Sequence, residues 1–379
     1  MKMKAFRYIT ACLLLSLLSI PAHALAPAYN VIDLGTLGGT YSRAYAVNSS
    51  GWVVGESKNA SGVYRGFLWR PGVGMTDLGT FGGPQASAHG INDSCEVVGY
   101  AENTSGFSRA FLWQAGSGMT DLGTLGGNES TGYAINNNGQ VVGDAFVTTS
   151  WYAFRWQAGA GMSSLSGDPQ MGPSTAYAIS GNGAIVGSSL SYGEWDHGFY
   201  WTAGSGMIDV GTFGGIGSYA RGVNNSGQVV GSAERPGPYP YVRGAWRAYL
   251  WQAGTGMIDL GDFGGTQAGA YGINNLGQVV GYATDAEGLW AYAFIWEQAT
   301  GMVDLNILID PGSGWLLSNA YGVNEAGWIV GYGRTPGGEP HAFLLQPVPE
   351  PGGALVLGAS TLALGLARGR RRGNTRWRR

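Results

Sequence analysis

The densest group of reactive side chains in the sequence is formed by Glu194, Asp196 and His197. Carboxyl and imidazole groups act as general acids and bases, so this group would suit a hydrolase or lyase acting on glycans. However, Asp196 and His197 are neighbours at the start of a predicted strand, and their side chains should point to opposite faces. The three residues are the catalytic candidates of the chain, but this divergence favours a protein that is not an enzyme.

Other signatures of catalysis are missing from the sequence. It contains no His/Cys spacing typical of a metal site, no phosphate-binding loop and no nucleophile elbow. The sequence therefore predicts no cofactor and no bound metal.

An aspartate recurs along the chain at a nearly fixed interval. Its copies are Asp33, Asp77, Asp121, Asp209, Asp259 and Asp304. A ring of carboxylates could bind Ca²⁺, but a protein seldom needs so many copies of one active group. Aspartate side chains also commonly accept hydrogen bonds from turn backbone. We therefore expect this series to be structural.

Seven aromatic residues fall in segments that vary in length between the repeated parts of the chain. Aromatic rings among polar groups can stack on sugars or contact another protein. These candidates for ligand binding are Tyr64, Trp151, Trp195, Tyr239, Tyr241, Trp246 and Trp290. The alternative is that the rings only anchor long loops to the scaffold.

The elements that position these residues belong to a repeat of about 44 residues. One tryptophan marks the repeat at Trp69, Trp113, Trp156, Trp201, Trp251 and Trp296, which we expect in the core. Within one unit, Ala44–Asn48, Trp52–Gly55, Gly66–Trp69 and Met75–Leu78 have the composition of short strands separated by Gly- and Asn-rich turns. Four strands in about 44 residues are typical of a β-propeller blade.

The offset of the repeat predicts that the sheets form a ring. The last unit lacks its fourth strand, whereas a single copy of that strand, Val31–Gly35, precedes the first unit. If the N-terminal strand completes the last unit, no sheet edge is left open. We expect an all-β fold over residues 25–347, a seven-bladed β-propeller of four-stranded antiparallel blades. An open β-solenoid is the alternative.

Charge and cysteine content limit the classes of partner. Residues 25–347 hold 11 basic and 23 acidic residues, so the sequence predicts no nucleic-acid binding. Cys95 is the single cysteine of this part of the chain, and it replaces the glycine of an Asn-x-x-Gly turn. We expect it to be a small buried apolar residue.

The N-terminus has the composition of a secretory signal peptide. Three basic residues precede an apolar run, and Ala22 and Ala24 form an A-x-A cleavage site. We expect residues 1–24 to be removed on export.

The C-terminus has three parts. Pro349, Glu350 and Pro351 precede an apolar segment, residues 352–367, predicted to be a helix, and a basic tail, residues 368–379. Residues 348–379 thus resemble the PEP-CTERM sorting signal of Gram-negative bacteria. The resemblance implies membrane anchoring, processing by an exosortase-type protease, and delivery to the cell surface or an exopolysaccharide matrix. A plain membrane anchor is the alternative.

The body of the chain also carries a family resemblance. Arg109–Trp113 and His341–Phe343 resemble the motif of the HAF family of bacterial extracellular repeats, and the likeness extends from Asp33 to Leu345. It implies an extracellular location and transfers no catalytic residues. The sequence therefore favours a non-catalytic binding or scaffold protein, with polysaccharide or a surface protein as partner. A glycan hydrolase or lyase and a purely structural matrix protein are the alternatives.

Overall fold

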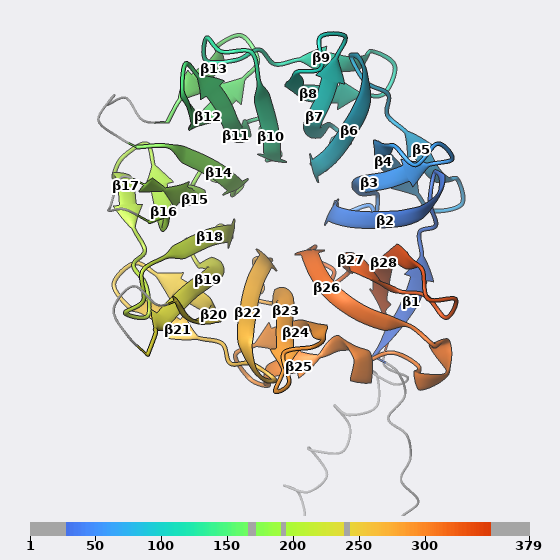
Figure 1. Cartoon of the computed structure of the whole chain (residues 1–379), viewed down its shortest axis with the longest axis vertical. Coiled ribbons are helices and arrows are strands. Elements are labelled where there is room, and N and C mark those ends of the chain that lie inside the picture. Colours follow the sequence, from blue (N-terminus) through green and yellow to red (C-terminus); the bar gives the residue numbers. More distant parts are fainter. Residues whose placement is uncertain (1–27, 166–171, 191–194, 239–242, 350–379) are drawn as a thin grey trace, which may run out of the picture.

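The computed structural model describes residues 28–165, 172–190, 195–238 and 243–349. Antiparallel sheets stand around a central axis, and the first strand of each repeat lies nearest that axis (Figure 1). The predicted all-β propeller with four-stranded antiparallel blades is confirmed in this part of the chain.

Hydrogen bonding groups the strands into five four-stranded sheets and one eight-stranded sheet. The first two four-stranded sheets consist of β2 (Gly38–Val47), β3 (Val53–Asn59), β4 (Tyr64–Arg70) and β5 (Gly74–Asp77), and of β6 (Gly82–Ile91), β7 (Val97–Asn103), β8 (Ser108–Gln114) and β9 (Gly118–Asp121). The next two consist of β10 (Ser130–Ile135), β11 (Val141–Val147), β12 (Ser150–Gln157) and β13 (Gly161–Ser164), and of β14 (Ser174–Ile179), β15 (Ile185–Ser189), β16 (His197–Thr202) and β17 (Gly206–Asp209).

The eight-stranded sheet consists of β18 (Ser218–Val223), β19 (Val229–Pro236), β20 (Arg243–Gln252), β21 (Gly256–Asp259), β22 (Gly264–Ile273), β23 (Val279–Asp285), β24 (Ala291–Glu297) and β25 (Gly301–Asp304). The remaining four-stranded sheet combines β1 (Tyr29–Asp33) with β26 (Leu316–Val323), β27 (Ile329–Arg334) and β28 (Pro340–Pro347). Two 3-10 turns, η2 (Leu305–Ile307) and η3 (Pro311–Ser313), precede β26.

The eight-stranded sheet departs from the predicted set of seven separate blades. A single parallel bridge between Trp246 and Gln267 joins β20 to β22. Trp246 pairs with Glu234 of β19, and β20 continues upstream to a pair between Arg243 and Pro236. This extension follows the longest connection between repeated strands, and its contact with the next sheet was not predicted from the sequence.

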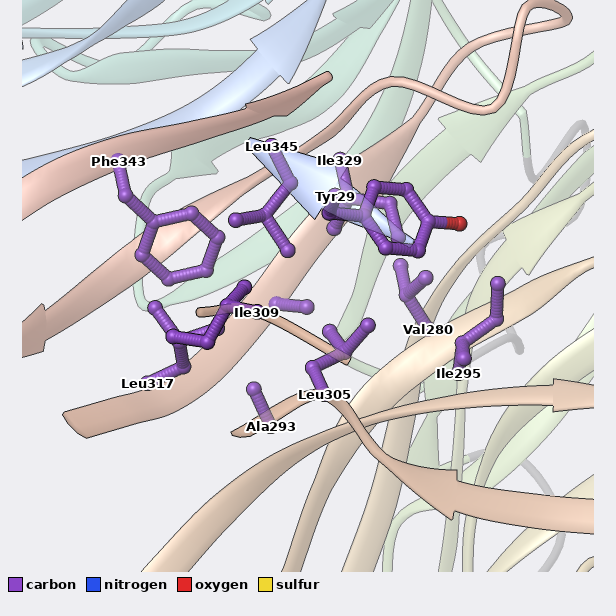
Figure 2. Close-up of a cluster of buried hydrophobic side chains, with 11 residues drawn as sticks. Tyr29, Val280, Ala293, Ile295, Leu305, Ile309, Leu317, Ile329, Phe343 and Leu345 are labelled. Carbon is purple, nitrogen blue, oxygen red and sulfur yellow. The ribbon is translucent and has the colours of Figure 1, made fainter. Parts of the chain in front are cut away.

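The N-terminal strand β1 is the outer strand of the sheet formed by β26, β27 and β28. Val31 pairs with Leu345, and the Tyr29 backbone N–H donates to Leu308 at 3.0 Å. Figure 2 shows the Tyr29 ring packed beside Leu345 and Ile329 in a cluster of buried apolar side chains. Segments from opposite ends of the chain therefore share one core.

Asparagine side chains link consecutive sheets at the turn that follows each inner strand. Within one turn, Asn48 Oδ1 accepts the backbone N–H of Trp52 at 2.9 Å. Its Nδ2 donates to the Asn92 carbonyl, 3.2 Å away in the next sheet. The same bond joins Asn324 to the Asn48 carbonyl at 3.0 Å, across the two ends of the described chain.

The predicted Asn-x-x-Gly hairpin turns are present. Gly51 has a φ of 74°, a left-handed conformation that glycine adopts without steric cost. Cys95, at the equivalent place, is forced to a φ of 63°. It is half-buried, so the expectation of a buried residue is wrong.

The core contains one fully buried aromatic ring per repeat. These rings are Phe67, Phe111, Phe154, Phe199, Tyr249, Phe294 and Phe343. The tryptophan two positions later is buried at Trp69 and Trp251 and half-buried at the other four positions. The phenylalanine series is therefore the main core element, and the tryptophans cover it.

Neither terminal segment can be compared with the structure in full. In the described ranges no helix is long and apolar enough to span a membrane. Residues 1–24 with the expected cleavage site, and residues 352–367 with the expected helix, lie outside those ranges, as do Glu350 and Pro351.

Candidate functional site

The repeated aspartates support the turns that follow the outer strands. Each carboxylate accepts a backbone N–H two residues ahead, as Asp121 does from Gly123 at 2.8 Å. The same bond occurs at Asp33, Asp77, Asp209, Asp259 and Asp304. The structural role expected for this series is confirmed.

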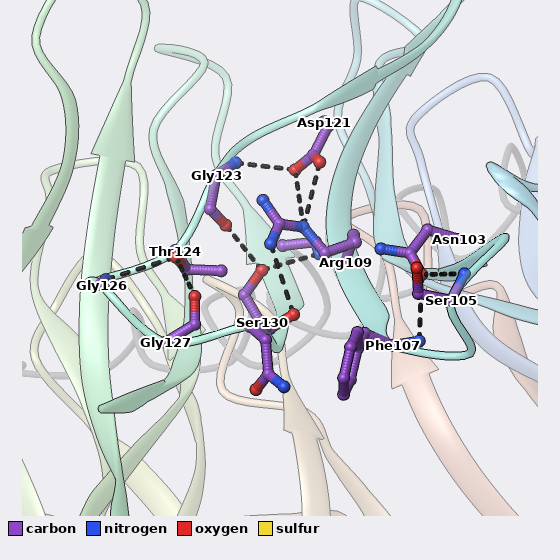
Figure 3. A network of polar contacts seen from close by, with 12 residues as sticks. Asn103, Ser105, Phe107, Arg109, Asp121, Gly123, Thr124, Gly126, Gly127 and Ser130 are labelled. Atoms are coloured by element: carbon purple, nitrogen blue, oxygen red, sulfur yellow. Dashed lines mark hydrogen bonds and ion pairs between the residues drawn. The ribbon is translucent and has the colours of Figure 1, made fainter. Parts of the chain in front are cut away.

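Among the described residues, five of these six aspartates contact a basic side chain, which the sequence did not predict. Arg109 contacts Asp121 at 3.0 Å, and its Nη1 donates to the Asn128 carbonyl at 3.3 Å (Figure 3). Equivalent contacts join Arg65 to Asp77, His197 to Asp209, Arg247 to Asp259 and His341 to Asp33. Among the described residues no group of three or more His, Cys, Asp or Glu side chains is arranged to hold a metal ion.

The catalytic candidates do not form one constellation. His197 Nδ1 lies 2.9 Å from Asp209 Oδ2, in the same role as the arginines above. Asp196 instead accepts the Tyr219 hydroxyl at 3.3 Å. The side chains of these two neighbours diverge as expected, and Glu194 lies outside the described residues.

Most of the predicted ligand-binding aromatics are separate from one another. Tyr64 packs edge-on against Tyr41, and Trp151 packs against Phe146. These two rings stabilise their own loops, which was the alternative explanation for the set.

The two most exposed tryptophans of the set are Trp195 and Trp290. Trp195 and Trp290 are 38% and 46% exposed, and the Arg334 guanidinium lies 5.7 Å from the Trp290 ring. Tyr239 and Tyr241 fall outside the described residues. Of the predicted aromatic residues, Trp246 lines a cavity.

Trp246 lines a cavity of about 290 Å³ between strands β18–β20 and strands β22–β23. On one side the Tyr219 and Trp246 rings are stacked, with centroids 5.5 Å apart and planes inclined by 22°. On the other side Tyr271 and Tyr282 are stacked at 5.7 Å and 23°. The remaining lining residues are Arg221, Ser232, Gln267, Gly269 and Ala270. We call this space the aromatic cavity.

Arg221 is the charged residue of the cavity lining. Its guanidinium carbon lies 4.1 Å from the centre of the Tyr177 ring and 5.1 Å from that of Tyr219. In the part of the chain that the structure describes, no hydrogen bond or ion pair engages this guanidinium. The cation is thus held by aromatic faces, and its N–H groups remain available to a ligand.

Arg221 occupies a position that is aromatic in the other repeats. Tyr45, His89, Tyr133, Tyr177, Tyr271 and Tyr321 are its counterparts on the inner strands. Several of them contact the next member, such as His89 and Tyr133, whose rings stack at 5.3 Å. Sequence reasoning missed this series, although the position can be found by aligning the inner strands and noting the single arginine.

The phenols of the cavity are neutral at physiological pH. Burial raises the pKa of Tyr271 to about 12. Burial, and secondly the Asp196 charge, also raise the pKa of Tyr219. The Tyr271 hydroxyl can therefore donate a hydrogen bond to a ligand instead of repelling an anion, whereas the Tyr219 hydroxyl already donates to Asp196 at 3.3 Å.

Two buried titratable groups lie near the centre of the fold, away from the aromatic cavity. Burial raises the pKa of Asp144 to about 7, although the Thr175 hydroxyl donates to its Oδ2 at 2.9 Å. Burial also lowers the pKa of His89 to about 4. The sequence did not indicate either group.

A second cavity, of about 310 Å³, opens among the turns at the other ends of the inner strands. Its polar lining comes from the linking asparagines and their neighbours, such as Asp93 and Asn137, which contact each other at 2.7 Å. These side chains hold adjacent sheets together, so we assign the lining to architecture.

No family model and no curated protein matches the sequence. A solved structure of a puromycin-hydrolysing peptidase from Mycobacterium tuberculosis is similar, with a TM-score of 0.51 and 13% identity, over 84% of this chain and 54% of the peptidase. TolB from Acinetobacter baumannii and a putative TolB from Agrobacterium tumefaciens each give a TM-score of 0.45 and 11% identity, over 83% and 82% of this chain. The matches span 65% and 91% of those two chains. At such identities the likeness to the peptidase concerns the propeller fold alone.

Proposed function

We propose that this chain is an exported propeller that binds glycan without catalysis, at the surface of the cell or in an exopolysaccharide matrix. The observation that carries the proposal is the aromatic cavity, where two stacked aromatic pairs from different strands face one small space. Its volume is that of about ten liquid water molecules, which suits a single pyranose unit.

The chemistry of the lining agrees with a sugar ligand. The apolar face of a pyranose can pack on Trp246 or Tyr282, because aromatic rings offer large apolar faces beside polar edges. Ser232 and Gln267 can exchange hydrogen bonds with sugar hydroxyls. A concave site with aromatic walls and a few polar groups is the usual form of a small-ligand site.

The scaffold in this proposal is a ring of seven blades closed by β1. One parallel bridge is a weak connection between blades, so the eight-stranded sheet counts as two blades. The bond from Asn324 to Asn48, and the bond from the Ala342 N–H to Ser42 Oγ at 2.8 Å, support closure. The second of these bonds repeats the one from Ala110 to Ser130 between neighbouring sheets.

Export and anchoring complete the proposal. A signal peptide would be removed after Ala24, and the C-terminal segment would act as a PEP-CTERM signal for an exosortase-type protease. The HAF resemblance of the body supports the same extracellular destination.

The test uses the purified full-length protein on a glycan array and on immobilised exopolysaccharide. We expect retention that Trp246→Ala reduces at least tenfold, since truncating a central aromatic commonly costs 2 kcal/mol or more, roughly. Trp290→Ala is the matched control, because Trp290 is exposed and does not line the cavity. Absence of retention, or equal retention by both variants, would contradict the proposal and favour a purely structural matrix protein.

A hydrolase or lyase acting on glycans is the second candidate. It is favoured by Asp196, whose carboxylate contacts Tyr219 at the edge of the aromatic cavity. Glycan turnover that Asp196→Asn or Glu194→Gln abolishes would establish it. Binding without any product in a broad glycan screen would dismiss it.

A further inference from the structure

We infer that the aromatic cavity selects a sugar that carries a carboxylate, such as a uronic acid unit, and that Arg221 is the residue that recognises it. The inference rests on the proposed glycan binding and names its ligand class. Neutral sugars need no cation in their site, so the presence of this arginine needs a separate explanation.

The first step is the state of the guanidinium. In the described residues Arg221 has aromatic neighbours, Tyr177 and Tyr219, and no carboxylate partner. The arginines near the start of the third strands, Arg65 and Arg109, are by contrast each paired with an aspartate. Arg221 therefore differs from them, because its strongest hydrogen-bonding capacity is unused by the fold.

The second step is the geometry of the lining. Arg221 lines the cavity together with Trp246 and Tyr271, which belong to the two stacked pairs. A pyranose packed on one of these pairs would present a C5 carboxylate beside the ring, within the same small space. A planar guanidinium and a carboxylate form a two-point, charge-assisted hydrogen bond.

The third step is the surrounding charge. Residues 25–347 are strongly acidic overall, so an anionic ligand needs a local cation to bind here. Asp196, which accepts the Tyr219 hydroxyl, and Glu234, which pairs with Trp246 across β19 and β20, are not part of the cavity lining. The hydroxyl of Tyr271 is a neutral donor, which also favours a carboxylate over a cation.

The ligand itself provides the sharpest test. Oligomers of galacturonate, glucuronate and mannuronate are each compared with the same oligomer after reduction of its carboxylates to alcohols. Calorimetry or surface plasmon resonance on the full-length protein measures both members of each pair. We expect at least one acidic oligomer to bind about tenfold more tightly than its reduced form, and added salt to narrow the difference.

Variants of Arg221 then test whether this residue causes the preference for acidic oligomers. Arg221→Gln should lose the preference for the acidic form while keeping weak binding of the reduced form, and Arg221→Lys should restore part of it. Arg334→Gln is the matched control, an exposed arginine outside the cavity, and should behave as the wild type. A thermal melt of Arg221→Gln shows whether the fold is kept, and the pairs measured on wild-type protein remain decisive if it is not.

The outcomes separate the inference from the proposal beneath it. If acidic and reduced oligomers bind equally, the inferred carboxylate ligand is wrong. If Arg221→Gln keeps the preference, the role given to Arg221 is wrong. In both cases glycan binding stands. If no oligomer of any kind binds, in these pairs or on the array, both are wrong.

Discussion

The buried carboxyl of Asp144 should make the stability of the protein fall as pH rises toward neutrality. The pKa of Asp144 is raised from 3.8 to about 7 by burial. Its Oδ2 accepts the Thr175 hydroxyl, and its Oδ1 is buried without a partner among the described residues. In the unfolded chain this carboxyl ionises near pH 4, whereas the folded chain holds the proton up to about pH 7. Folding is therefore favoured below pH 4 and progressively penalised as pH rises to 7.

The size of the penalty follows from the two pKa values. One pKa unit corresponds to about 1.4 kcal/mol, so the interval from 3.8 to about 7 corresponds to about 4 kcal/mol above pH 7. Asp144→Asn cannot ionise and removes this dependence, although its amide adds a buried donor that costs about 1–3 kcal/mol at every pH. The difference in unfolding free energy between variant and wild type should thus change by about 4 kcal/mol between pH 4 and pH 8, in favour of the variant.

Urea unfolding of both proteins at intervals from pH 4 to pH 8 measures how the difference in their unfolding free energies changes with pH. Thr175→Val gives a second check, because the lost hydroxyl donor raises the pKa of Asp144 further and should extend the fall to higher pH. Parallel stability curves for the wild type and Asp144→Asn would show that this carboxyl has the same pKa in the folded and unfolded chains, and the reasoning from burial would be refuted.

Three further predictions concern the scaffold. Deleting β1, Tyr29–Asp33, should lower the unfolding free energy by about 3 kcal/mol or more, because the deletion exposes Leu345 and removes the buried Tyr29. An unchanged melting temperature would contradict ring closure. Cys95→Gly should raise stability by about 0.5–1 kcal/mol, since glycine accepts the φ of 63° without strain; a lower melting temperature would refute this. Asp93→Asn should destabilise the protein at pH 7 and leave its stability unchanged near pH 2. Burial raises the pKa of Asp93, but hydrogen bonds from Ser49 and Asn137 outweigh it and lower that pKa, so the stabilisation from the carboxylate is lost as pH falls through the folded pKa. An equal loss of stability at both pH values would count against this prediction.

The repeat made the architecture predictable because the same residue types recur at equivalent positions in most units. Copies such as Gly51 and Asp121 allowed the turn glycines, the strand composition and the role of the aspartates to be predicted. Agreement between copies at one position outweighs the sequence variation of any single copy. The basic partners of the aspartates were missed because they differ in type, Arg in some units and His in others. The predicted tryptophans do belong to the core, at Trp69 and Trp251, or pack against it at the other positions, but the fully buried ring two positions earlier was not predicted.

The site was less predictable because it depends on contacts between units. The sequence placed Trp246 among seven aromatics, but it gave no sign that Tyr219, Tyr271 and Tyr282 would face it. These tyrosines lie on strands from neighbouring repeats, and their convergence is set by the spacing of sheets around the axis. In the sequence, Arg221 differs from the aromatic residues at the same position of the other inner strands. The sequence alone did not show that this position borders a cavity.

The same local irregularity that joins two sheets also shapes the aromatic cavity. Trp246 and Gln267 form the parallel bridge between β20 and β22, and both residues line the cavity. A backbone bridge restricts sliding of one sheet past the other, so the two aromatic pairs are held at a fixed separation before any ligand arrives. A site ordered in advance loses less conformational entropy on binding than one that must be assembled. Among the described strands, the Trp246–Gln267 bridge is thus a place where the repeated scaffold joins two neighbouring sheets directly at a cavity.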